Sequence, residues 1–480
     1  MKNLPNELFK YTQDKNTPYF NFHNYRFNDN EKTNNSLCKF LFSTMDEVRL
    51  WFAEDYARAI LELTDIDDAT HFRKGVLRRE VIGEIAYSNQ RDHAAHTLYN
   101  YLLGWYIISN NTMINNHFIN ALQNRLGNED FNHEENWIDN FGCLWPFTSL
   151  LHDIGYLLEG VLEATDPSVQ SKMVQRGIAV IKDYFTHRYW HEIKMSSIEE
   201  RYLLKKITLV EEPNFSDYSI AAVADTLRDL GNLRDLVKSV KQKLHDASLT
   251  IPDQLNILNS DANDAFNVWI AHYNAYSRNV SITERMKEIQ STFESYLWDG
   301  LPTKGIRILD HGVCSGLISL HFSTFFFRMF FAYKDEPEDP RDAIIWKKFK
   351  NEGDRNHDYD PNWWWTGIVW GTGAAAIHNI QQQKRPWFPN GKDCGKLTMD
   401  EDPLAYLGIL VDILQEWDRY AVQRRASIIG SLPLQGIDVK LGISNNIINI
   451  DYGEELWARK VKIALDQALS DWDKVVSIQP

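Results

Sequence analysis

The chain has 480 residues, of which 44% are hydrophobic and 24% are charged. This is the balance of an ordinary globular protein, which excludes a disordered or fibrous chain, and the length allows one large core or two to three domains. The formal net charge of -15 disfavours a broad nucleic-acid-binding surface, because such surfaces bind through many Lys and Arg contacts to phosphates.

Cysteine content and hydropathy favour a cytoplasmic protein. The chain has 4 cysteines and no CxxC pair, a pattern typical of a reducing compartment. The first residues, "MKNLPNELFK", lack the apolar core of a signal peptide. The most apolar run, at 317–333, contains His321 and Arg328 and is shorter than the ~20 residues that a membrane span needs, so we expect a buried helix there.

The hydrophobic pattern predicts mainly helices along the first third of the chain. Residues 1–45 are rich in Asn, Lys and aromatic residues without clear periodicity, which favours an irregular N-terminal arm. From residue 46 apolar residues recur three and four apart, with Thr44 as a candidate N-cap. The segment "HAAHTLYNYLLGWYII", residues 93–108, continues the same helical pattern.

The remainder of the chain predicts more helices and one small β element. Residues 161–300 carry few candidate catalytic residues, and apolar helical patterns return at 301–333 and 400–430. In "GIDVKLGISNNIINIDYG", residues 436–453, apolar and polar residues alternate around Asn-Asn, which predicts a β-hairpin, and an amphipathic helix follows. We therefore expect an N-terminal arm at 1–45 and the first half of one core at 46–160. An accessory helical insertion follows at 161–300, then the second half of the core at 301–430 and a C-terminal hairpin with helix at 431–480.

Side chains that bind metals recur within the apolar helical segments. His152 and Asp153 stand side by side in "SLLHDIGYLLEG", where burial is costly unless each group finds a partner. A single pair of this kind is as often the polar seam of a half-exposed helix. Similar surroundings hold further candidates, namely His93, His96, His311, His378 and Asp412. Together these residues supply imidazoles and carboxylates from separate helices, as a metal site in the core of a helical bundle requires.

The order His … His-Asp … Asp resembles that of the HD-domain metal-dependent phosphohydrolases. The segment "RDHAAHTLYNYLLG" is similar to the opening HD helix of deoxynucleoside triphosphate triphosphohydrolases. In that family the ligand histidine is followed by Ser or Thr and then Leu or Met, with a small residue eight positions on. His96-Thr97-Leu98 with Gly104 fits this pattern, which favours His96 over His93 as the ligand.

The resemblance implies a mainly α fold, an HD-domain helical bundle, and a set of metal ligands. These ligands are His96, His152, Asp153 and Asp412, and Asp418 is the fallback for the last position. The cofactor implied is a divalent metal, Mn, Mg, Fe or Co, as one or two ions.

Two further segments resemble the two-metal branches of the superfamily. They are "HGVCSGLISL", which begins at His311, and His378-Asn379. Those branches include cyclic-nucleotide and dinucleotide phosphodiesterases, and also an oxygenase. The six candidate ligands exceed what one ion ordinarily needs, so we expect two metals; if a single ion binds, His311 and His378 are assigned to substrate contact or packing.

The ligand pattern also suggests roles in catalysis. Adjacent residues of a helix diverge by ~100°, so Asp153 is expected to reach a second metal or the attacking water while His152 holds the first metal. His93, one helical turn before the predicted ligand, is a candidate to protonate a leaving group or bind phosphate, and equally a packing or surface residue. Arg91 and Lys304 are candidate phosphate clamps.

From the resemblance we expect a metal-dependent phosphohydrolase acting on nucleotides. The first choice is a dGTPase-like deoxynucleoside triphosphate triphosphohydrolase that releases nucleoside and triphosphate, with a role in phage defence by analogy. After the His-Asp pair the chain reads "IGYLLEG" where that family has a Gly/Pro/Phe/His-rich stretch, so a two-metal phosphodiesterase stays open. A nucleotide-binding regulatory subunit on an HD scaffold is the alternative of another class. The partners expected are a nucleotide substrate, a nucleotide effector and a second copy or partner protein, with no membrane and no extended nucleic acid.

Overall fold

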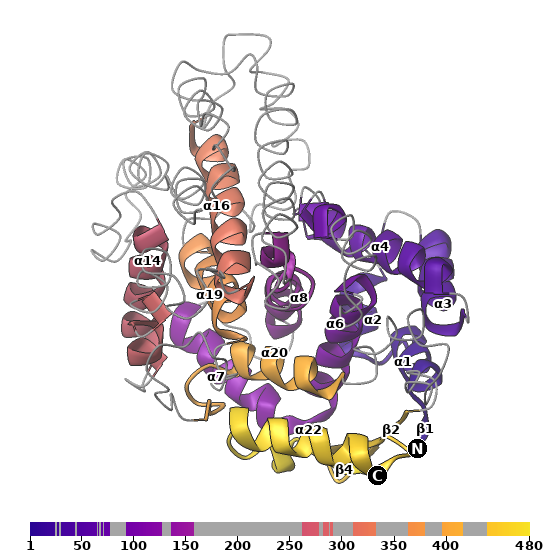
Figure 1. Cartoon of the computed structure of the whole chain (residues 1–480). Helices are drawn as coiled ribbons and strands as arrows, with labels where there is room; N and C mark the ends of the chain where they lie inside the picture. Colours follow the sequence, from indigo (N-terminus) through magenta and orange to yellow (C-terminus); the bar gives the residue numbers. More distant parts are fainter. Residues whose placement is uncertain are drawn as a thin grey trace, which may run out of the picture. The chain divides into compact units, whose positions relative to one another are not determined.

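A computed structural model gives the fold of the chain. The described residues, with short gaps inside the first and fourth ranges, are 1–76, 93–126, 136–157, 262–290, 311–332, 363–379, 396–415 and 439–480. The chain divides into two compact units, of which the first comprises Met1–Asp153, Tyr276–Ile282 and Ile377–Pro480 and the second Ile154–Ala275 and Thr283–Ala376. The described residues are mainly helical, as the sequence predicted (Figure 1).

The core of the first unit is built by three helices that contact one another. They are α6 (His93–Asn110), α8 (Asn136–Ser149) and α20 (Pro403–Leu414), which lie side by side in Figure 1. The close approach of α6 and α8 requires a glycine, because a Cβ on Gly104 would overlap the ring of Trp145. Around this core the unit adds α1 (Leu4–Gln13), α2 (Pro18–His23), α3 (Asn30–Phe42), α4 (Asp46–Leu63), α7 (Thr112–Leu126) and α22 (Glu455–Ala468).

The prediction of an irregular arm over residues 1–45 was wrong, because this segment forms α1, α2 and α3. Leu4, Leu8 and Tyr11 follow helical spacing and are buried, so α1 has an apolar face that its many polar residues conceal in the sequence. Thr17 caps α2 by accepting a hydrogen bond of 3.1 Å from the backbone N–H of Phe20.

A buried group of aromatic residues joins α2 to α6. The Nδ1–H of His23 donates to the carbonyl oxygen of Tyr19 over 2.6 Å, and its Nε2 accepts from the Tyr101 hydroxyl over 2.7 Å. The rings of Tyr19 and His23 stack with centroids 3.9 Å apart. Burial lowers the pKa of His23 to about 3, and it raises the pKa values of Tyr19 and Tyr101. His23 is therefore neutral in the folded protein.

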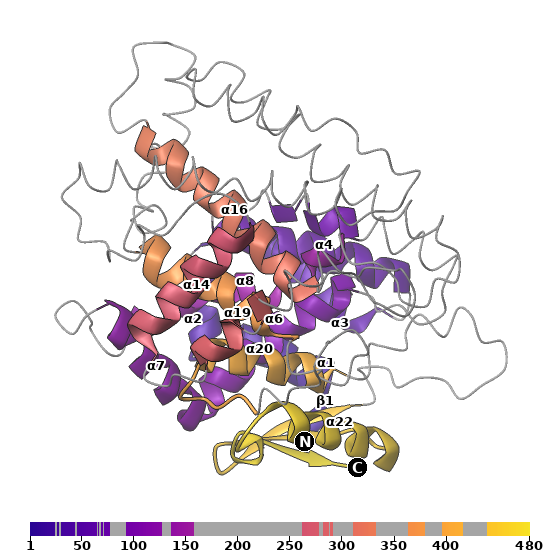
Figure 2. The ribbon, with the colours of Figure 1, turned by 60° about the vertical axis from the view of Figure 1, so that its left-hand side comes forward.

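A small sheet in the first unit combines both ends of the chain. Its order is β1 (Lys2–Asn3), β2 (Lys440–Ser444), β3 (Ile447–Asp451) and β4 (Val476–Gln479), and both ends of the chain lie beside it in Figure 2. The predicted hairpin is confirmed as β2 and β3, with Asn445 and Asn446 in the left-handed region at φ 52° and 61°. Such a pair of residues is what a two-residue turn between twisted strands requires. The predicted last helix, α22, precedes β4, which runs parallel to β3.

The described part of the second unit is helical. It contains η2 (Ile154–Leu157) and α16 (His311–Ala332), together with α14 (Ala262–Tyr276) up to Ala275, η5 (Trp364–Ile368) and most of α19 (Val369–Ile377). Gly316 lets α16 approach α19 closely, because a Cβ there would lie 2.7 Å from the carbonyl oxygen of Thr372. The helix predicted at 317–333 is confirmed, with Leu317–Leu320 buried, while residues 161–261 lie outside the described residues. Among the described residues we find no helix with the length and hydropathy needed to cross a membrane.

The neutral state of His23 predicts a dependence of stability on pH. The unfolded chain takes up a proton near pH 6.5, and the folded chain does so only near pH 3, so stability falls as the pH drops between these values. We expect the wild type to lose about 2 kcal/mol more unfolding free energy than His23→Gln between pH 7 and pH 5. Urea unfolding of the full chain at both pH values measures this difference.

His117→Gln provides the control for the loss of a histidine, because His117 is only half-buried and its Nδ1 lies 2.9 Å from the exposed Asp400 Oδ1. An identical loss of stability in the wild type and in His23→Gln on acidification would show that His23 is not the titrating group.

Candidate metal centre

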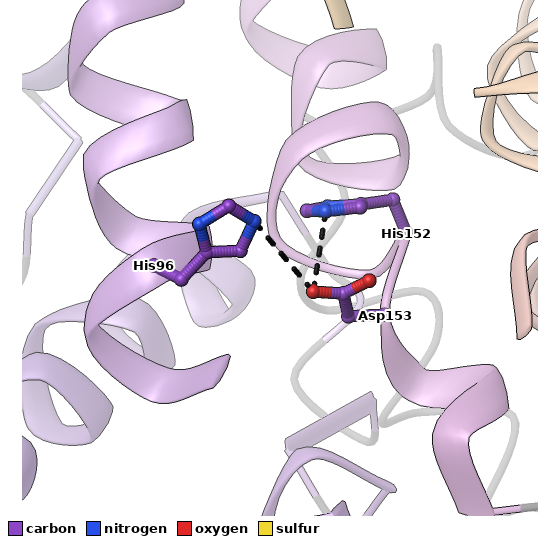
Figure 3. A group of neighbouring side chains, drawn as sticks. All are labelled: His96, His152 and Asp153. Atoms are coloured by element: carbon purple, nitrogen blue, oxygen red, sulfur yellow. Dashed lines mark ion pairs between the residues drawn. The ribbon is translucent and has the colours of Figure 1, made fainter. Parts of the chain in front are cut away.

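Three segments of the first unit bring imidazole and carboxylate groups into one buried group, here called the His/Asp cluster. His96 comes from α6, His152 and Asp153 follow α8, and Asp412 comes from α20. Their exposed fractions are 1%, 1%, 2% and 4%. Figure 3 shows the rings of His96 and His152 on one side of the Asp153 carboxylate, each with a nitrogen directed toward it. These predicted ligands come from three segments that lie far apart in the sequence.

His152 and Asp153 lie in a turn rather than on a helix, which differs from our expectation. The N–H groups of Leu150 and Leu151 both donate to the carbonyl oxygen of Pro146, over 2.9 and 3.1 Å, so the regular hydrogen-bond ladder of α8 stops there. Both side chains consequently face the same cluster, because the ~100° divergence of adjacent helical residues does not apply in a turn.

The sequence of α20 explains why Asp412 comes so close to α8. Asp402 begins the helix by accepting hydrogen bonds of 3.0 Å from the N–H groups of Leu404 and Ala405. A Cβ on Gly408 would lie 2.7 Å from the methyl carbon of Thr148, so glycine permits the close packing of the two helices. Asp412 is one turn further along the same helix.

The distances within the His/Asp cluster fit a shared cation. Asp412 Oδ1 lies 2.8 Å from His96 Nε2 and 3.8 Å from His152 Nε2. Asp153 Oδ2 lies 3.3 Å from His152 Nε2 and 3.7 Å from His96 Nε2. Ligands about 2.1 Å from one ion are about 3.0 Å apart in octahedral and about 3.4 Å apart in tetrahedral geometry. Small adjustments would therefore allow all four groups to bind one divalent metal.

The hydrogen bond on the far side of His152 fixes which nitrogen faces the cluster. Its Nδ1 lies 2.7 Å from the carbonyl oxygen of Ser149, which can only accept, so Nδ1 carries the hydrogen. In the neutral ring Nε2 then directs a lone pair at the Asp153 carboxylate, which is also an acceptor. Two acceptors at this distance need a proton or a metal ion between them. A histidine held by a carbonyl at one nitrogen is the usual arrangement of a metal ligand.

Two more histidines lie near Asp153. His93 Nε2 is 4.0 Å from Asp153 Oδ2, and His378 Nε2 is 3.9 Å from Asp153 Oδ1. The His378 ring also meets the His152 ring at 85°, with centroids 4.6 Å apart. The two oxygens of Asp153 therefore face different histidines, which suits a carboxylate that bridges two positions.

The remaining predicted site residues are His311, Arg91, Lys304 and Asp418. His311 begins α16 in the second unit, where its ring stacks on that of Tyr156 with centroids 3.9 Å apart. Arg91, Lys304 and Asp418 lie outside the described residues.

An arginine that the sequence analysis missed supports two of the ligand segments. Arg73 is buried and pairs with Glu54 of α4. Its Nη1 donates to Thr97 Oγ1 over 2.8 Å and to the carbonyl oxygen of Leu150 over 2.5 Å. Thr97 follows His96 and Leu150 precedes His152 by two residues, so Arg73 ties both ligand segments together. No local pattern marks this arginine in the sequence.

No family model, no curated protein and no solved structure matches the chain. A functional assignment therefore rests on the chain's own residues.

The cluster predicts that His152 and Asp153 are needed for metal binding. His152→Ala and Asp153→Ala should keep the helical circular dichroism of the wild type but lose stoichiometric metal, because each removes a buried ligand. Added metal should then raise the urea midpoint of the wild type and not that of either variant. Elemental analysis after reconstitution and dialysis measures the metal content.

His117→Ala is the matched control outside the cluster and should retain the metal. Full metal content in either His152→Ala or Asp153→Ala would show that the His-Asp pair is a buried polar contact and not a metal site.

Proposed function

We propose that this chain is a metal-dependent phosphohydrolase built on an HD-type helical core. The observation that carries the proposal is the buried convergence of His96, His152, Asp153 and Asp412 from three separate segments. Imidazole and carboxylate are good ligands for divalent first-row metals. The order of these residues along the chain, which resembles that of the HD phosphohydrolases, supports the same proposal.

The chemistry of such a centre suits attack of water on phosphorus. A divalent metal held there would lower the pKa of a bound water and offset charge on the phosphoryl oxygens. Asp153 offers one oxygen to the His/Asp cluster and the other to the side of His378, so it can orient the water and accept its proton. His93, 4.0 Å from Asp153 and at the start of α6, is our candidate to protonate the leaving oxygen.

A nucleotide is the proposed substrate, and a deoxynucleoside triphosphate is the first choice. The supporting observation is the likeness of the His96 helix to that of the triphosphohydrolases. Gly104, the small residue of the family pattern, packs against Trp145. It is therefore evidence for the fold more directly than for the substrate. The net charge of -15 disfavours long nucleic acids as substrates.

One observation favours a second candidate, a two-metal phosphodiesterase acting on cyclic nucleotides or dinucleotides. His378 lies 3.9 Å from the Asp153 oxygen that faces away from the other three histidines. A carboxylate with imidazoles on both of its sides suits a bridge between two metals.

The number of bound metals tests the phosphodiesterase candidate. If two ions bind, the paired change His311→Ala and His378→Ala should reduce the metal content from two ions per chain to one, because it removes the ligands proposed for the second ion. Elemental analysis of protein purified with metal present measures the ratio. A single metal in the wild type that survives the paired change would assign both histidines to substrate contact or packing.

The reaction products test the substrate. We expect purified protein with Mn, Mg, Fe or Co to convert a deoxynucleoside triphosphate to nucleoside and intact tripolyphosphate, because water attack at the α-phosphorus expels the nucleoside. Phosphorus NMR of the mixture identifies the product whatever the base, and the Asp153→Ala protein is the control.

Other products would redirect the assignment. Cleavage of a cyclic nucleotide or dinucleotide, with none of the four deoxynucleoside triphosphates cleaved, would select the phosphodiesterase. Tight nucleotide binding without turnover would select the regulatory subunit.

A further inference from the structure

A buried asparagine shares the His/Asp cluster with the four predicted ligands. Asn100 lies one helical turn after His96 on α6 and is 1% exposed. Its Nδ2 is 3.3 Å from His96 Nε2 and 3.4 Å from His152 Nε2. These are the ring nitrogens that face the two carboxylates. The amide of Asn100 therefore points into the cluster at the same spacing as the ligands themselves.

A second buried amide, that of Gln415, holds the amide of Asn100. Gln415 follows α20 three residues after Asp412 and is fully buried. Its Nε2 donates a hydrogen bond to Asn100 Oδ1, and its Oε1 has no hydrogen-bond partner among the described residues. The two ends of an amide have nearly the same shape. If both side-chain amides rotate so that N and O exchange places, Asn100 Nδ2 donates to Gln415 Oε1, and Asn100 Oδ1 faces the two imidazoles.

Charge decides which end of the Asn100 amide suits a metal-loaded cluster. A metal bound by His96 and His152 uses the Nε2 lone pairs, so an N–H group of Asn100 would lose its acceptors there and face a cation. An amide oxygen, in contrast, is an ordinary ligand for hard divalent ions. We propose that Asn100 binds the metal through Oδ1 and that Gln415 holds it in that orientation. This assignment rests on the metal centre proposed above.

The additional ligand bears on which metal is bound. His96, Asn100, His152, Asp153 and Asp412 would together fill five positions around one ion. An octahedral ion would keep one open position for water or a phosphate oxygen, whereas a tetrahedral ion has no room for five ligands. The assignment therefore favours Mg, Mn, Fe or Co over Zn.

Cobalt binding by the full chain tests the role of Asn100. Asn100→Leu keeps the branched shape but removes both polar atoms, so the dissociation constant for Co(II) should rise at least about tenfold. The visible absorption of bound cobalt should become more intense, because its intensity increases as the coordination number falls. Asn100→Asp, which must present an oxygen, should bind cobalt at least as tightly as the wild type and keep the wild-type intensity.

Asn111→Leu is the matched control. Asn111 is also buried, but its Nδ2 donates to the carbonyl oxygen of Asn446 over 2.6 Å, away from the cluster. This variant should keep the wild-type cobalt affinity and spectrum even if its fold is less stable.

The possible results separate this assignment from the metal centre itself. A wild type that binds no cobalt overturns both. A wild type that binds cobalt, with an unchanged spectrum in Asn100→Leu, overturns only the ligand role, and a weaker affinity would then make Asn100 a support for the histidines. If Asn100→Leu does not fold, weaker binding or a more intense spectrum in Asn100→Asp overturns the assignment.

Discussion

The first unit must compensate the burial of two carboxylates, those of Asp153 and Asp412, and this is the main physical constraint on its core. An ionised carboxylate in a helical core is costly unless positive charge and hydrogen bonds compensate it. The imidazoles of His96 and His152 lie beside these two carboxylates, and they carry positive charge only when they are protonated. Glycines let the helices around the cluster pack closely, because Gly104 of α6 lies against Trp145 of α8 and Gly408 of α20 lies against Thr148 of α8. The packing of the core thus keeps negative charge in a place where a cation is needed.

A second set of charged residues in the same unit, the buried Arg73 and its partner Glu54, differs from the His/Asp cluster. Arg73 and Glu54 neutralise one another, and the remaining Arg73 donors reach Thr97 and the carbonyl oxygen of Leu150. That pair is complete without any ligand. Arg73 bonds to the hydroxyl of Thr97, next to His96, and to the carbonyl oxygen of Leu150, two residues before His152, so it supports both segments without a ligand. One charged group therefore serves as scaffold, and the other is the proposed metal site.

The sequence predicted the elements and residues whose signals are local or whose residue types are rare. The helix at 93–108, the hairpin around Asn445–Asn446, and the set His96, His152, Asp153 and Asp412 all follow from short patterns, and the structure brings that set together. Their role as metal ligands stays a prediction. The helices of residues 1–45 escaped notice because asparagines and lysines obscure their apolar faces.

Residues whose partners are distant in the sequence could not be predicted in this way. Arg73 contacts Leu150, and Asn100 contacts Gln415, only because the fold brings them together. Strands β1 and β4 were missed for the same reason, since β1 pairs with β2 from the other end of the chain. The spacing of four residues between His96 and Asn100 was the one local signal for a further polar group on the same helix face.

The pairing of Lys2 with Leu441 has a consequence for synthesis on the ribosome. The chain emerges from its N-terminus, and domains generally fold as units during this process. The residues of the second unit all precede Ile377, so this unit can fold while the sheet of the first unit still lacks three of its strands. Asp412 also emerges after His96, His152 and Asp153, so the His/Asp cluster cannot be complete before α20 has been synthesised. Binding of the proposed metal is therefore expected only after Asp412 has been synthesised and α20 has packed against α6 and α8.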